Sequence, residues 1–158
     1  MRNEVIHQKY SLQVPDQYET LSEADLRQMY RSGDPFRWGV RDRENHVIII
    51  AMWKQYPALL SWALDLKAIA KKNEQLTRNL HGDRGYRLLE FFSMQAGGEP
   101  VEGYRFCARN ESDVSQVSSC FLLKDGKTVY SFICTCREEQ MDEALPVINQ
   151  MMASLRKV

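Results

Sequence analysis

Hydrophobic residues alternate or run together through the second half of the chain, in a pattern that predicts an antiparallel sheet. Four such runs follow one another, over residues 86–95, 100–110, 114–124 and 127–136. The turns between them are short and contain glycine or polar residues, which is typical of consecutive antiparallel strands. We therefore expect a four-stranded meander in this part of the chain.

The last two runs form a hairpin whose two faces are both apolar. With residues 125–126 (Asp-Gly) as the central turn residues, Cys120 lies opposite Ser131. Side chains alternate between the two faces of a strand, so Cys134 and Cys136 share one face and Cys120 lies on the other. Apolar residues on both faces predict a sheet that is covered from both sides.

Before the meander, strands and helices alternate. Residues 5–14 carry apolar residues at alternate positions and are followed by Pro15, which predicts a strand that stops there. Ser22 and Asp25 have the spacing of a capping box, so a short helix is expected to begin at Ser22.

A second hairpin and two longer helices complete the pattern. The hairpin runs out over residues 36–42 and back over 46–54. Its return strand is apolar on both faces over residues 47–53, which predicts a place inside the sheet rather than at an edge. Apolar residues recur at helical spacing over residues 57–80, the longest helix, and again over about 139–156.

These elements predict an α+β fold in the order β-α-ββ-α-ββββ-α. The expected architecture is a three-layer α/β/α sandwich with a mainly antiparallel sheet of about six or seven strands. The chain has 158 residues, without internal repeats or linker-like stretches, so we expect a single domain over residues 1–158.

Charge and hydropathy argue against some classes of partner. Lys and Arg number 21 and Asp and Glu number 21, so the formal net charge is zero. A neutral chain has no global attraction to nucleic acid or to an anionic membrane, and we expect neither as a partner. No apolar run approaches the roughly 20 residues that span a bilayer. The N-terminus lacks the pattern of a signal peptide, so we expect a cytoplasmic protein.

The cysteines all lie in predicted strands; they are Cys107, Cys120, Cys134 and Cys136. The hairpin register places Cys120 on the opposite face from Cys134 and Cys136. Cys134 and Cys136 are two residues apart on one extended strand, so they are poorly placed to form a disulfide with each other. We expect buried free thiols in a reducing compartment. The alternative is a metal or redox pair that uses Cys134, Cys136 and Cys107, but C-x-C within a strand matches zinc sites weakly. We therefore predict no metal and no cofactor.

No catalytic constellation stands out. His7, His46 and His81 fall in separate elements, and none has a metal-type partner at useful spacing. Four carboxylates within residues 138–143 stabilise the start of the last helix more simply than they form an acid–base pair. The motifs of serine hydrolases, zincins and P-loop proteins are absent from the sequence. We expect a protein without catalytic activity.

Six basic residues within a short stretch form the candidate protein-binding surface. They are Lys67, Lys71, Lys72, Arg78, Arg84 and Arg87. Such a stretch is either a solvated helix face or a docking patch for an acidic protein or a phosphate-bearing ligand. Aromatic residues are not interleaved with these charges, as a platform for single-stranded nucleic acid would require.

The order and spacing of the elements resemble the PsbP-like superfamily. That group includes the photosystem II extrinsic protein, a Ran-binding nuclear import factor and bacterial proteins of the DcrB type. The resemblance rests on the opening strand and proline over residues 10–15, the short helix and hairpin that follow, the late hairpin over 124–130, and the helix end over 151–155. It implies a structural role in protein binding or assembly, with no shared active site. No residue-level match to a Ran-binding surface is found.

Two functions follow as hypotheses. The first is a non-catalytic, cytoplasmic protein-binding module, an adaptor or assembly factor, whose partner and oligomeric state the sequence does not identify. The second is a small-molecule-binding protein or weak enzyme. Its pocket would lie between the sheet and the long helix, near Trp62 and the face that carries Cys134 and Cys136. A cleft there with convergent polar groups would favour the second hypothesis.

Overall fold

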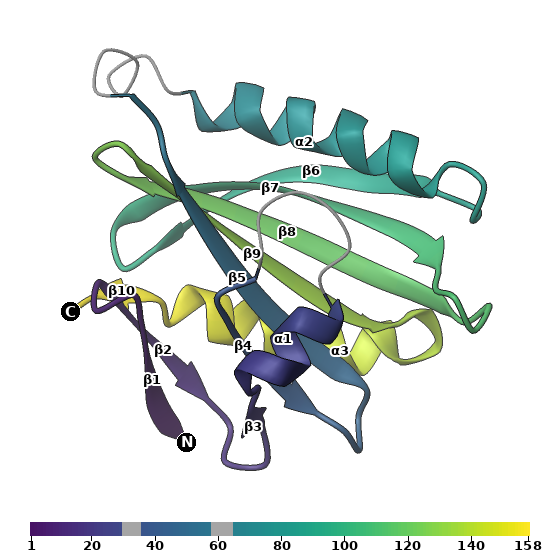
Figure 1. Ribbon diagram of the computed structural model, residues 1–158, viewed down its shortest axis with the longest axis horizontal. Coiled ribbons are helices and arrows are strands. Elements are labelled where there is room, and N and C mark those ends of the chain that lie inside the picture. The colour runs from purple at the N-terminus through teal and green to yellow at the C-terminus, as the bar shows by residue number, and fades with distance from the viewer. Residues whose placement is uncertain (30–35, 58–64) are drawn as a thin grey trace.

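The computed structural model describes residues 1–29, 36–57 and 65–158 (Figure 1). Its strands are β1 (Arg2–Ile6), β2 (Tyr10–Val14), β3 (Glu19–Thr20), β4 (Trp38–Asp42), β5 (Val47–Gln55), β6 (Arg87–Ala96), β7 (Glu99–Arg109), β8 (Ser115–Asp125), β9 (Thr128–Arg137) and β10 (Arg156–Lys157). Its helices are α1 (Glu23–Met29), α2 (Leu66–His81) and α3 (Met141–Ala153), with a short 3-10 helix, η2 (Glu138–Gln140), directly before α3. These elements confirm the α+β class.

The described strands form a seven-stranded antiparallel sheet and a smaller three-stranded one. The order in the main sheet is β3-β4-β5-β9-β8-β7-β6. The four strands from β6 to β9 are the predicted meander, and their ends lie within one residue of the expected positions. The apolar strand β5 lies between β4 and β9, as its pattern predicts.

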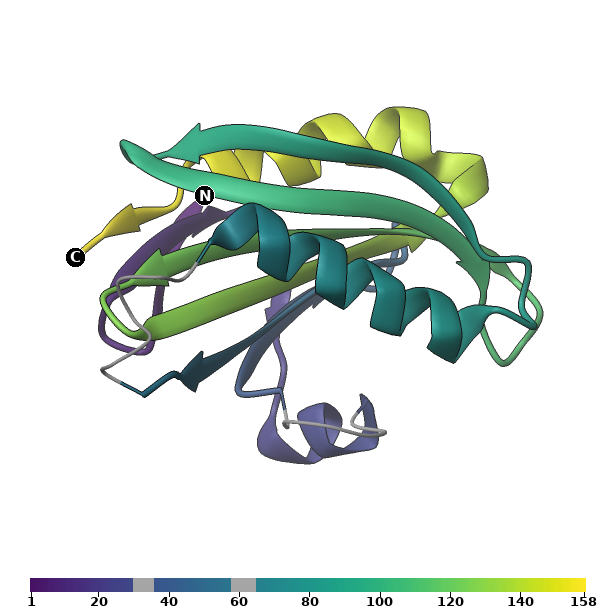
Figure 2. The same cartoon turned by 90° about the horizontal axis from the view of Figure 1, so that it is seen from above.

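Helices cover the main sheet from both sides. Figure 2 shows α2 on one face of the sheet and α3 on the opposite face. Helix α2 packs on β7 and β8, whereas α3 contacts β9, β6 and strand β2 of the small sheet. The three-layer α/β/α arrangement is therefore confirmed, with the small sheet sharing the α3 face.

The core consists of two clusters, one on each face of the main sheet. Phe121 and Leu123 of β8 belong to the larger cluster, under α3 and the small sheet. Their neighbour Leu122 belongs to the smaller cluster, under α2. Successive residues of one strand thus belong to different clusters, as the apolar pattern on both faces predicted.

The N-terminal strand prediction needs a correction. Residues 5–14 do not form one strand: β1 and β2 form a hairpin, and with β10 they make the separate small sheet. The chain reverses at His7 and Gln8, whose φ angles of 54° and 55° lie in the left-handed region. Residues other than glycine rarely adopt this conformation, so the sequence carried no visible turn signal.

The register of the last hairpin also differs from the prediction. Asp125 pairs with Thr128, so the two turn residues are Gly126 and Lys127, and Cys120 lies opposite Ile133. Gly126 has a φ of 59°, and glycine at the first central position is typical of a type II′ turn. The pairing is displaced by two residues in total, which leaves every side chain on its predicted face.

Polar side chains fix the starts of α1 and α2. The amide and hydroxyl of Ser22 donate to Asp25 Oδ2 at 3.0 and 2.9 Å, and the Asp25 amide donates to Ser22 Oγ at 3.1 Å, which confirms the capping box. Asp65 caps α2 by accepting from the Lys67 amide at 3.0 Å. Because Asp65 is extended, α2 begins at Leu66 and not at residue 57 as predicted; residues 58–64 lie outside the described residues.

Candidate functional site

A cleft lies between α2 and the main sheet, on the side of the helix that faces β9 and β5. Its volume is about 510 Å³, and we term it the α2 cleft. Ligand sites in proteins typically range from about 300 to 1,000 Å³. Another hollow, about 470 Å³, lies around η2 and is lined mainly by charged residues.

The α2 cleft forms because α2 covers only part of its face of the sheet. On β5, the side chains directed toward α3, such as Ile49 and Ala51, are fully buried. Their neighbours Ile50 and Met52, on the α2 face, are only half-buried. The helix packs on β7 and β8, so the same face of β9 and β5 is left as a floor beside it.

Three walls enclose the cleft. The helix contributes one face at spacings of three and four residues, formed by Ile69, Lys72, Asn73, Leu76 and Thr77. The floor comes from β7, β8 and β9, through Tyr104, Cys120, Val129, Ser131 and Ile133. The end of β5 closes the cleft with Met52, Trp53, Lys54 and, just beyond the strand, Tyr56. The walls are therefore mainly apolar, with a few hydroxyl, amide and ammonium groups.

Hydroxyl groups at the inner wall of the cleft form a fixed network. The Thr77 hydroxyl donates to the Asn73 carbonyl at 2.8 Å and lies 2.9 Å from the Tyr104 hydroxyl. Burial raises the pKa of Tyr104 well above its ordinary value of 10.0, and burial raises the pKa of the Cys120 thiol to about 12. Both groups therefore carry their protons at neutral pH.

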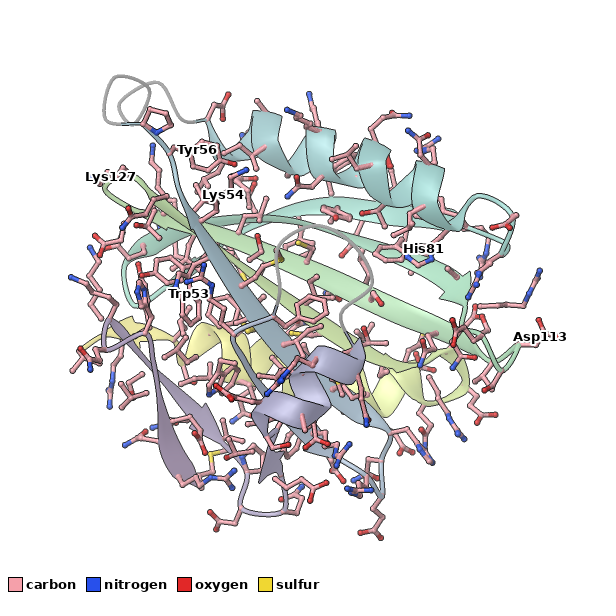
Figure 3. All side chains as sticks on the ribbon, viewed as in Figure 1. Trp53, Lys54, Tyr56, His81, Asp113 and Lys127 are labelled. Atoms are coloured by element: carbon pink, nitrogen blue, oxygen red, sulfur yellow. The ribbon has the colours of Figure 1, made fainter. Side chains whose placement is uncertain are left out.

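Lysine side chains lie near the end of the molecule where α2 begins. Figure 3 shows Lys54 and Tyr56 close to Lys127, at the end where α2 begins. The Tyr56 amide donates to the Lys127 carbonyl at 2.7 Å, which joins the end of β5 to the β8–β9 turn. His81 and Asp113 lie at the other end of the molecule. Two lysines, Lys54 and Lys127, therefore lie at the end formed by β5 and the turn.

The cysteines predicted to line the pocket lie on the wrong face. Cys134 and Cys136 are fully buried in the cluster under α3, and the cleft instead contains Cys120. The reason is strand parity, since even positions of β9 face α3 and even positions of β8 face α2. Trp62, the third predicted pocket residue, lies outside the described residues.

All four cysteines are buried free thiols, as predicted. Burial raises the pKa of Cys134 well above its ordinary value and raises that of Cys136 to about 11. Burial also raises the pKa of Cys107. Over residues 1–29, 36–57 and 65–158, no group of three or more His, Cys, Asp or Glu side chains is placed to hold a metal ion.

The predicted basic surface does not form one patch. Lys67 and Lys71 are exposed on α2, whereas Lys72 lines the α2 cleft. Arg84 lies beyond the end of α2, beside a separate hollow of about 390 Å³ that Arg109 also lines. Lys72 and Arg78 of α2 are also exposed, so four of the six residues lie on this helix.

The remaining two arginines, Arg78 and Arg87, form ion pairs with carboxylates. Arg87 pairs with Cys107 in the sheet register and so projects toward the α3 face, where it donates to Glu138 at 2.7 Å. The Arg78 guanidinium donates to Glu74 at 2.8 Å. These contacts divide the six basic residues between two faces of the molecule.

Glu74 is a residue whose importance the sequence pattern did not reveal. It is buried in α2 at 4% exposure and accepts hydrogen bonds from Arg78 and, at 3.1 Å, from the Tyr86 hydroxyl. These contacts fasten α2 to the segment that enters β6. The spacing of Glu74 and Arg78, four residues apart on a helix, was the available signal.

The histidine at the β1–β2 turn holds the small sheet against the main one. The His7 ring stacks on Trp53 with centroids 4.5 Å apart, and its Nδ1 lies 2.7 Å from the Tyr130 hydroxyl. Both partners belong to the main sheet. This arrangement favours a structural role for His7.

Comparisons with known proteins show similarity at the level of fold. No family model matches the sequence, and no curated protein matches it as a relative. The solution structure of the cyanobacterial PsbP protein, CyanoP, from Synechocystis sp. PCC 6803 matches with a TM-score of 0.73. It has 10% sequence identity, over 99% of this chain and 92% of that one.

Two crystal structures match less closely. LpqN, involved in cell envelope biogenesis of Mycobacterium tuberculosis, gives a TM-score of 0.59 at 12% identity, over 94% of this chain and 83% of that one. A protein from Bacteroides thetaiotaomicron gives 0.58 at 11% identity, over 99% of this chain and 48% of that one. The fold is therefore the one that the sequence resemblance predicted.

Proposed function

We propose that this protein, which has the PsbP-like fold, is a non-catalytic binding module that holds a small, partly apolar ligand in the α2 cleft. The observation that carries the proposal is the cleft itself, a space of about 510 Å³ between a helix and the main sheet. Its half-buried apolar side chains, including Met52 and Ile133, would be covered by a ligand. Its hydroxyl groups would fix the orientation of that ligand.

Binding without catalysis is favoured by the protonation of the cleft. Cys120 and Tyr104 are two groups on the floor of the cleft that could act as nucleophile or base after losing a proton. Their raised pKa values keep both protonated at neutral pH. They therefore serve as hydrogen-bonding groups in this proposal.

The test is a titration of the labelled protein with octanol and with octanoate, followed by NMR. We expect shift changes at Ile133, Val129 and Ile69, and none at Ile148 on the α3 face. The variant Ile133→Trp, which fills the cleft, should abolish the changes, with Ser131→Phe as a second filling variant if the first unfolds. The proposal is discarded if neither probe perturbs the cleft residues.

A second candidate is the protein-binding adaptor, and one observation favours it. Leu76 and Leu80 of α2 are 57% and 62% exposed, and Lys72, four residues before Leu76, is exposed on the same face of the helix. Exposed apolar side chains beside charges are typical of protein interaction surfaces. In this proposal, an acidic protein would dock on the outer side of α2.

The adaptor candidate is tested by reversing the charge of its surface. Partners captured by the wild type and by a Lys67→Glu, Lys71→Glu, Lys72→Glu variant would be compared, and each captured protein would then be titrated directly. Identical partner sets with equal affinities would remove this surface from consideration. A Lys127→Glu variant, at the β8–β9 turn, is the control.

The proposal also includes a cytoplasmic setting and no nucleic-acid or membrane partner. It is supported by the zero net charge and by four free thiols, which are typical of reducing compartments. Within the described part of the chain, no helix is long and apolar enough to cross a membrane. Cell fractionation would test the setting, since recovery in an envelope fraction would contradict it.

A further inference from the structure

We infer that the ligand of the α2 cleft is a small amphipathic carboxylate, whose anionic head lies between Lys54 and Lys72. This inference rests on the proposed binding function and adds the chemical class of the ligand. Its apolar body would lie on the floor formed by Val129 and Ile133. Nothing in the fold comparison bears on it, and it follows from the charges and contacts of the cleft.

The charged side chains that line the described cleft are all positive. Two lysines line the cleft, and none of the described residues that line it is acidic. The acids of α2 and its cap are engaged elsewhere: Asp65 accepts from the Lys67 amide, and Glu74 is held by Arg78 and Tyr86. An anion in the cleft would therefore meet only positive charge on its walls.

Within the described residues, the ammonium groups of Lys54 and Lys72 have no acidic partner. Neither Lys54 nor Lys72 forms a hydrogen bond or ion pair with any described residue; the nearest specific contact is the Tyr56 ring, whose centroid is 5.9 Å from Lys54 Nζ. Arginines elsewhere, such as Arg87 and Arg105, have carboxylate partners within 2.7 Å. The two unpaired lysines thus lie where a ligand would approach.

Several apolar side chains of the cleft are partly exposed to water. Val129 is buried at 4% exposure on the floor, while Met52 and Ile133 beside it are half-buried. Leu76, 57% exposed, forms the outer lip of the same cleft. A ligand body that covered these groups would remove their apolar surface from water, which favours binding.

The charged donors of the described cleft are lysines, which act as point charges and attract any anionic head. Lysines bind both carboxylate and phosphate groups, so octyl phosphate is used as a second anionic probe, and tighter binding of octyl phosphate than of octanoate overturns the carboxylate. The Ser131 hydroxyl, which has no partner among the described residues, is available as a further donor. One carboxylate head matches this set.

The experiment compares octanoate with octanol, which share a chain length and differ in charge. We expect the wild type to bind octanoate at least about tenfold more tightly than octanol, about 1.4 kcal/mol, because the carboxylate can accept charge-assisted hydrogen bonds from the lysines. The variant Lys54→Met, Lys72→Met keeps the apolar stems and should lose this preference while still binding octanol. The matched control, Lys67→Met, Lys71→Met, removes the same charge from exposed positions of α2 and should keep the preference.

The outcomes separate this inference from the function on which it rests. Equal affinity for octanoate and octanol, or a preference that survives Lys54→Met, Lys72→Met, overturns the carboxylate and leaves cleft binding in place. Binding of an acidic peptide without binding of octanoate also overturns it. If neither octanoate nor octanol perturbs the cleft residues of the wild type, the proposed function itself fails. Thermal unfolding of each variant would confirm that it is folded.

Discussion

A single buried carboxylate shows how one side chain organises this fold. Glu74 lies in the middle of α2, where it accepts bonds from Arg78 of its own helix and Tyr86 of the next segment. The Arg78 guanidinium also lies over the Tyr86 ring, 5.6 Å from its centroid. The charge is thus satisfied locally, which is the condition for burying a carboxylate without a large penalty.

Glu74→Gln should therefore destabilise the protein by about 1–2 kcal/mol, a loss moderated because Arg78 is partly exposed to water. The measurement is the midpoint of urea unfolding. The matched control is Glu23→Gln, which breaks another Glu–Arg pair four residues apart, in α1, where both side chains are largely exposed. An equal effect of the two substitutions would contradict the role of burial.

Glu138 predicts a pH dependence. It accepts from Ser115 at 2.5 Å and from Arg87 at 2.7 Å, and these hydrogen bonds lower its pKa below the ordinary 4.5. The ionised form is favoured by folding, so its contribution is present at neutral pH and is lost as the pH falls from 4.5 through the lowered value.

Glu138→Gln should reduce stability at neutral pH and flatten the loss in acid. Urea midpoints across the acid range would show this, with Glu139→Gln, a neighbouring substitution at a more exposed side chain, as the control. Parallel pH profiles for the wild type and Glu138→Gln would show that this carboxylate is not coupled to folding.

Some strands could be predicted accurately from the sequence, and others could not. The meander could be predicted to within one residue because alternating apolar positions and short turns coincide there. The β1–β2 hairpin could not, because His7 and Gln8 adopt left-handed backbone without glycine. In the last hairpin, glycine takes the first rather than the second central position, which changes the pairing but not the faces.

The position of the pocket could be predicted from the sequence, but its lining residues could not. A pocket between the sheet and the long helix could be predicted, because two covered faces and one amphipathic helix imply a boundary between them. The cysteines were misassigned, since which of two faces lies under α2 is a tertiary property. Lys54 was missed because it lies at the exposed end of an apolar strand and acquires its position only when α2 packs nearby.

Strand β7 contains a close approach that tests the register of the sheet. Gly103 lies opposite Phe92 on one side and Phe121 on the other, and these two rings meet edge to face at 5.1 Å. A Cβ atom at position 103 would collide with the Phe92 ring and with the Cys120 carbonyl. The glycine therefore makes room for the ring pair.

Gly103→Ala should cost about 1–3 kcal/mol through overpacking. Removing the ring with the additional change Phe92→Ala should not restore stability, because the collision with the Cys120 carbonyl persists. Thermal unfolding of the single and double variants would measure this. A wild-type melting temperature for Gly103→Ala would refute the register described for β7 and β8.

At the scale of the whole molecule, the two faces of the main sheet are unequally closed. The α3 face, shared with the small sheet, contains the larger cluster, and the α2 face contains the smaller cluster and the cleft. The sequence showed that both faces are apolar but not that one is covered less completely.

The inequality predicts a difference between two isoleucines on opposite helices. Ile148→Ala in α3, where the side chain is fully buried, should cost about 3 kcal/mol. Ile69→Ala in α2, at the half-buried wall of the cleft, should cost less than half as much. Equal losses in urea unfolding would show that the α2 face is as tightly packed as the α3 face.

The position of β5 in the main sheet has a consequence for how the chain acquires its fold. β5 pairs with β9, but β9 is synthesised only after α2 and three further strands. Until then its apolar run has one sheet edge without a partner, a condition that favours aggregation. Closing so long a stretch of chain is slow compared with forming local hairpins. We therefore expect the meander to assemble first and the joining of β5 to β9 to limit the rate at which newly made chains mature.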